Sequence, residues 1–77
     1  MPELPNVSGK DALKAFLLAG WTVKRITGSH HIVHKPGHDP FPIPIHGNRD
    51  LKPGTLRSMI KSAGMTVDEF TNLLKQL

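Results

Sequence analysis

The middle of the chain, residues 21–46, has the sequence WTVKRITGSHHIVHKPGHDPFPIPIH and predicts a small antiparallel sheet. Residues 21–27 and 30–35 are rich in β-branched and aromatic side chains, which favour strands. Gly28-Ser29 between these runs and Pro36-Gly37 after them are turn signals. Because the connections are short, we expect consecutive strands to run antiparallel.

A third run, residues 41–46, alternates apolar residues with proline, and we expect His38-Asp39-Pro40 to extend the loop before it. Alternate residues of a strand direct their N–H groups to the same side, so Pro42 and Pro44 remove donors from one side only. The donors of the intervening isoleucines stay available on the other side. This segment therefore predicts an edge strand that pairs with a single neighbour.

A helix is predicted before the sheet, over residues 9–19, with Ser8 as its N-cap. Its apolar face holds Leu13, Phe16 and Leu17 at helical spacing.

Two further helices are predicted after the sheet. Pro53 suits the first turn of one and Gly64 its end, while Thr66 and Glu69 fit a capping box that opens a short last helix. Their apolar stripes are formed by Leu56, Met59, Ile60 and Ala63, and by Val67, Phe70, Leu73, Leu74 and Leu77. The order predicts an α+β fold with helices packed on one face of the sheet, in a single domain over residues 1–77 with an irregular lead-in over residues 1–7.

The composition narrows the classes of function. The chain has 77 residues, no cysteine, 10 basic and 6 acidic residues and a net charge of +4. The absent cysteines exclude a disulfide framework, a thiolate zinc site and a cysteine nucleophile. No apolar run approaches the roughly 18 residues of a membrane span, and the first residues lack the pattern of a signal peptide. We expect a cytoplasmic domain without membrane association whose partner is polyanionic or acidic.

The histidines are concentrated in residues 30–46. On a strand, His30 and His34 share one face, whereas His31 lies on the other. Four strand residues span about 13 Å, which is too far for two imidazoles to share one zinc ion. The sequence therefore predicts no metal site.

Two motifs occur in a set order: Gly28-Ser29-His30 before the second strand, and Gly54-Thr55-Leu56-Arg57-Ser58 at the start of the second helix. Gly20-Trp21, Arg25 and residues 34–37 accompany them. In these features the sequence resembles the HicA family, the toxins of bacterial and archaeal toxin–antitoxin pairs, over nearly the whole chain.

The resemblance implies a fold similar to double-stranded-RNA-binding domains, with a three-stranded antiparallel sheet and helices on one face. It also implies that the protein cleaves mRNA, that His30 is the catalytic residue, and that a HicB-like antitoxin neutralises it by direct binding. The sequence departs from the family pattern in the loop through residues 38–40 and in the doubled proline at Pro42 and Pro44, both of which concern the third strand.

A single imidazole suits this chemistry, because RNA carries its own nucleophile in the 2′-hydroxyl beside each phosphodiester. A positioned histidine can take or give a proton near neutral pH, and lysine or arginine can stabilise charge on the phosphate. No metal or small-molecule cofactor is required. His31, His34 and His46 are candidates for a second acid or base by composition only, and that role is unassigned.

Basic residues near the motifs form the predicted RNA-binding surface. Lys52 precedes the Pro53-Gly54 helix start, where free N–H groups and the helix dipole favour a phosphate. Contacts to the phosphate backbone would give affinity without sequence choice. The predicted RNA-binding residues are Lys24, Arg25, Ser29, Lys35, Lys52, Arg57 and Lys61.

Two alternatives stay open at the level of sequence. A non-catalytic RNA-binding module of the same fold would lose little when His30 is replaced. A structural or ribosome-associated basic protein would bind RNA with a steep salt dependence and leave no cut ends. Trp21 could stack on a base, but its position after a helix end favours a place in the core.

Overall fold

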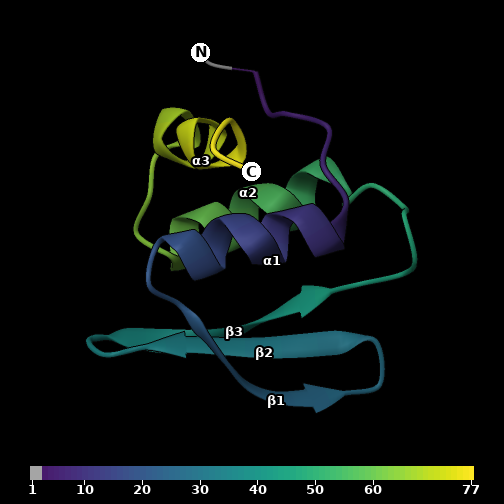
Figure 1. Ribbon diagram of the computed structural model, residues 1–77, viewed down its shortest axis with the longest axis vertical. Coiled ribbons are helices and arrows are strands. Elements are labelled where there is room, and N and C mark those ends of the chain that lie inside the picture. The colour runs from purple at the N-terminus through teal and green to yellow at the C-terminus, as the bar shows by residue number, and fades with distance from the viewer. Residues whose placement is uncertain (1–2) are drawn as a thin grey trace.

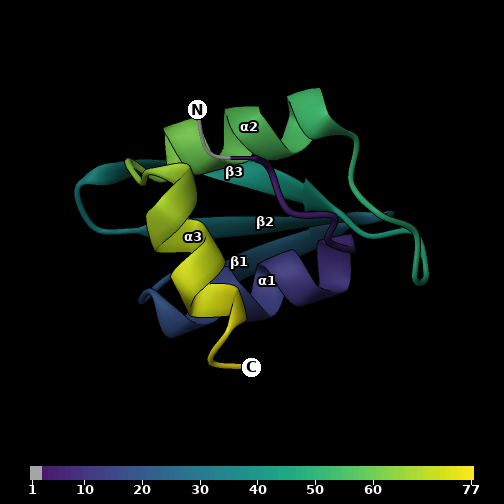
Figure 2. The same cartoon turned by 90° about the horizontal axis from the view of Figure 1, so that it is seen from above.

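The computed structural model describes residues 3–77, and its elements follow the predicted order (Figure 1). The elements are α1 (Gly9–Leu18), β1 (Thr22–Thr27), β2 (His30–Lys35), β3 (His38–Pro44), α2 (Pro53–Ser62) and α3 (Val67–Leu74). The strands form one antiparallel sheet in the order β1-β2-β3, and the three helices lie on one side of it (Figure 1, Figure 2). The predicted α+β fold is confirmed.

Residues 3–7 form neither helix nor strand, whereas Met1 and Pro2, the first residues of the predicted lead-in, lie outside the described residues. Within residues 3–77, no helix is both long enough and apolar enough to cross a membrane.

Side-chain caps fix where two of the helices begin. Ser8 Oγ accepts a hydrogen bond from the Asp11 N–H at 3.2 Å, which caps α1 as predicted. The capping box of α3 is complete, because Thr66 Oγ1 accepts from the Glu69 N–H and Glu69 Oε1 accepts from the Thr66 N–H.

The start of β3 was predicted wrongly. Residues 38–40 were expected to lengthen the loop, but they belong to the strand, and His38 pairs with Lys35 of β2. The reason is that Pro36-Gly37 completes the turn in two residues, with Gly37 at a φ of 83° that suits glycine.

β3 is an edge strand, as predicted: in the described part of the chain, β2 is its one strand neighbour. The Ile45 N–H donates to the Ser29 carbonyl at 2.8 Å, so Ile43, two residues earlier, also directs its backbone groups toward β2. Pro42 and Pro44 therefore face the free edge, where a missing N–H costs no ladder hydrogen bond.

The core lies between the sheet and the helices and is centred on Phe16 of α1. The Phe16 ring centroid lies 5.3 Å from that of Phe41, 5.1 Å from that of Phe70 and 6.5 Å from that of Trp21. Trp21 is 1% exposed, which confirms its place in the core.

The apolar face of α1 was predicted only in part. Phe16 is fully buried, but Leu17 is 43% exposed. The buried face instead contains Ala12 and Ala15, whose small side chains let the helix lie close to its neighbours.

Gly9 provides a test of this packing. A Cβ at Gly9 would overlap the Pro44 carbonyl oxygen, because the start of α1 lies directly against the end of β3. We expect Gly9→Ala to lower the free energy of unfolding by about 1–3 kcal/mol through overpacking, although alanine is the better helix former. Urea unfolding measures the change.

Gly54→Ala is the matched control, because a Cβ at Gly54 meets no atom within 4 Å. This variant should be neutral or more stable by up to about 1 kcal/mol. Equal stability of the two variants would contradict the close approach at Gly9.

Candidate active site

One end of the molecule brings together the β1–β2 turn, the end of β3 and the starts of α1 and α2 (Figure 1). We call it the motif end (residues 28–30 and 44–55). The Leu51 N–H donates to the Val7 carbonyl at 2.8 Å, so the segments that precede the two helices are held side by side. The two sequence motifs, far apart along the chain, therefore lie at the same end of the fold.

His30 is the first residue of β2, and its side chain lies on the face of the sheet without helices. Its partners in register are Thr27 of β1 and Pro44 of β3, and paired residues share a face. The residue is exposed, so a large substrate can reach it. His31 points the other way, toward the helices, and is half-buried, as the strand alternation predicts.

Arg25 of β1 lies on the same face of the sheet as His30 and is its diagonal neighbour on the adjacent strand. It pairs with Ile32, which is two residues from His30 along β2. Diagonal neighbours on a sheet face are about 7–8 Å apart, which is within reach of a long side chain such as that of arginine.

A β-bulge produces this placement. The register shifts between Val23 and Arg25, so Lys24 is an extra residue in β1. Without it, Arg25 would oppose His31 and would lie on the helix side of the sheet. The bulge therefore places the guanidinium on the same face as the His30 imidazole.

Two more predicted residues lie at the motif end. Ser29 is in the turn that precedes His30, and Lys52 occupies the N-cap position of α2. The Lys52 side chain makes no capping hydrogen bond, and both residues are exposed.

The other predicted RNA-binding residues are not gathered there. Lys35 and Lys61 lie near the ends of β2 and α2, away from the motif end. The Lys35 ammonium donates to the Ala19 carbonyl at 2.9 Å and so caps the end of α1. Arg57 is exposed within α2, and Lys24 is exposed in the bulge.

A cleft at the motif end contains Arg49, a residue that the sequence prediction did not assign to the site. It has a volume of about 280 Å³ and includes Lys52, His46 and Arg49, with Asp50 as its acidic group. Arg49 was interpreted only as part of a polar turn. Its proximity to Lys52 along the chain was the one available signal, because the cleft forms only when the loop between β3 and α2 folds.

In residues 3–77, no three acidic or histidine side chains are grouped as metal ligands.

These features define a small basic α+β domain with an exposed histidine and an arginine on a bare sheet face. The family model described as the HicA toxin of bacterial toxin–antitoxin systems matches residues 9–65, well over half of the chain. The chain belongs to this toxin family, whose systems imply an antitoxin partner. Among curated proteins, no significant match is found.

Lys35 provides a test that separates a structural role from RNA binding. Lys35→Met removes the ammonium bond to the Ala19 carbonyl, and we expect the free energy of unfolding to fall by about 1–2 kcal/mol. Lys10→Met, at an exposed position of α1, is the control and should change stability by less than about 0.5 kcal/mol. Urea unfolding compares them, and a Lys35→Met protein as stable as wild type would refute the capping role.

Proposed function

We propose that this toxin is a metal-independent endoribonuclease that cleaves mRNA, with His30 as its catalytic acid or base. The observation that supports this function most directly is that the exposed His30 and Arg25 are diagonal neighbours on the face of the sheet without helices. A flat, uncovered face admits a polymer, whereas a closed pocket would select a small molecule.

The chemistry follows from the substrate. The 2′-oxygen attacks the adjacent phosphorus, and the bond from phosphorus to the 5′-oxygen breaks. His30 takes the proton of the 2′-hydroxyl or gives a proton to the departing 5′-oxygen, a contribution worth roughly 10²–10⁴-fold in rate, and water accepts or supplies the other proton. Arg25 stabilises the charge that builds up on the phosphate oxygens.

The basic cleft extends this surface along the RNA. Ser29 and Lys52 lie at the same end as His30, and His46 and Arg49 line the cleft beside Lys52. Their contacts would hold phosphates on either side of the cleaved bond. Lys24, Lys35, Arg57 and Lys61 would meet only more distant parts of a longer RNA, and Lys35 would do so alongside its bond to α1.

A HicB-like antitoxin would inhibit the toxin by covering His30 and the motif end, in the cytoplasm where the mRNA is translated. The net charge of +4 favours an antitoxin surface that is acidic where it meets the cleft. A neighbouring reading frame that encodes such a protein would support this pairing.

Replacement of His30 tests the catalytic role. His30→Ala should lower the rate of RNA cleavage by about 10²–10⁴-fold and abolish growth arrest, without loss of the fold. Cleavage of a labelled RNA by purified protein measures the rate, and circular dichroism checks the fold.

His34→Ala is the matched control, because His34 is exposed on the same strand and the same face, about 13 Å away. It should keep most of the activity. If the His30→Ala protein cleaves RNA as wild type does, His30 is not the catalytic residue. If wild-type protein binds RNA but leaves no cut ends, the protein is a non-catalytic RNA-binding module instead.

Arg25 tests charge stabilisation. Arg25→Ala should lower the cleavage rate by about 10–100-fold, and Arg25→Lys should recover part of it, since a cation at that position still faces the phosphate. Lys61→Ala, near the far end of α2, should change the rate by less than about threefold. The rates are measured at saturating RNA so that weaker binding does not imitate slower chemistry. Equal loss in Arg25→Ala and Lys61→Ala would contradict a specific role for Arg25.

A further inference from the structure

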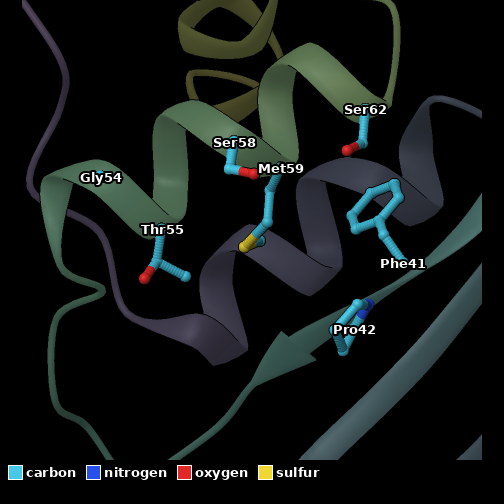
Figure 3. Close-up of a pocket in the computed structure, with 7 residues that line it drawn as sticks. All are labelled: Phe41, Pro42, Gly54, Thr55, Ser58, Met59 and Ser62. Atoms are coloured by element: carbon cyan, nitrogen blue, oxygen red, sulfur yellow. The ribbon is translucent and has the colours of Figure 1, made fainter.

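A second hollow lies between α2 and the free edge of β3, and the chemistry proposed at His30 does not use it (Figure 3). We call it the α2–β3 groove; Phe41 and Pro42 line it from β3, and one face of α2 lines it from Gly54 to Ser62. Its volume is about 390 Å³, within the range of small-molecule sites, roughly 300–1,000 Å³.

The groove has an apolar floor and a hydroxyl-bearing side. Phe41 and Met59 contribute ring and thioether surface to it, although each is otherwise almost buried. Thr55, Ser58 and Ser62 follow one another at spacings of three and four residues, so they share one face of α2 (Figure 3). This combination suits a flat apolar ring whose edge carries hydrogen-bonding groups.

The strand edge beside the groove is unsuited to a peptide. Every second residue of β3 from Pro40 to Pro44 is a proline, and proline has no backbone N–H. At Pro42 and Pro44, which face away from β2, the edge therefore has no donor. An added strand needs both donors and acceptors from the edge, and this edge provides acceptors only. The occupant is therefore one that does not depend on a backbone ladder.

The charge next to the groove indicates what its occupant is attached to. The groove shares Thr55 with the basic cleft of the motif end, where Lys52, Arg49 and His46 lie. An occupant that reaches the groove from that side passes the basic cleft. A negatively charged group attached to such an occupant would be bound there. A nucleotide has this form, with its phosphate at the cleft and its base in the groove.

We propose that the α2–β3 groove binds one unpaired nucleobase of an RNA strand whose phosphate is held at Lys52. The proposal rests on RNA being the substrate of the proposed function, and it adds a site that favours single-stranded over duplex RNA. In duplex RNA the paired bases stay stacked inside the double helix. A base of a single strand can instead turn outward and lie against Phe41 and Met59.

Binding rather than cleavage tests this proposal. Wild-type protein is titrated with a fluorescent 2′-O-methyl RNA hexamer, in which the nucleophile is blocked, and with an abasic strand of the same length and charge. Ser58→Leu fills the groove from an exposed position of α2, and Asn72→Leu places the same side chain on an exposed position of α3 as the control. Lys52→Ala reports on the phosphate contact.

We expect Ser58→Leu to weaken binding of the base-bearing strand by about tenfold while binding of the abasic strand is unchanged. Lys52→Ala should weaken binding of both strands, and Asn72→Leu should weaken binding of neither. The conservative variant Ser62→Ala should weaken binding of the base-bearing strand only. Thermal unfolding checks that every variant is folded, so the test does not depend on the folding of one variant.

The outcomes separate this proposal from the proposed function. If wild-type protein binds both strands equally, or Ser58→Leu binds both as wild type does, the groove holds no base and the proposal is wrong, while RNA cleavage at His30 is unaffected. If wild-type protein binds neither strand, RNA is not the ligand and both proposals are wrong.

Discussion

The packing of Phe16 is the contact on which the other parts of the structure depend. Its ring touches Phe41 of the sheet, Phe70 of α3 and Trp21 at the entry to β1, so one side chain joins the first helix to elements from the rest of the chain. Removal of a buried phenylalanine typically costs about 3–5 kcal/mol, a large part of the stability of a domain this small. The position of α1, and with it the motif end, is fixed by this contact.

The prolines of β3 determine what can lie on its other side. Because Pro42 and Pro44 offer no N–H to the free edge, a fourth strand is not expected to pair there. α2, in the layer of helices, lies across the groove from this edge. The close approach of Gly9 to the Pro44 carbonyl then brings the start of α1 to the same edge. A feature that departs from the family pattern thus helps to build the end of the molecule where both family motifs meet.

Much of this arrangement was predictable, because it depends on local rules. The N-cap of α1, the capping box of α3, the strand alternation that separates His30 from His31, and the edge position of β3 all follow from residues close together in the chain. The bulge at Lys24 was not predictable, since a bulge is defined by the partner strand and leaves no pattern in β1 itself. The cleft at Arg49 was missed for a different reason: its lining residues all lie within residues 44–55, but they surround a hollow only once the loop between β3 and α2 has folded.

The exposure of His30 therefore depends on register more than on the residue itself. A slip of one residue in β2 would turn His31 outward and His30 toward the helices. What prevents the slip is the burial of Val33 and Ile43 on the helix side, opposite Phe16 and its neighbours. The cost is visible at His31, whose Nδ1 is buried without a hydrogen-bond partner among residues 3–77. Apolar packing outweighs that cost, and the core thereby selects which of two adjacent histidines lies on the face of the sheet without helices.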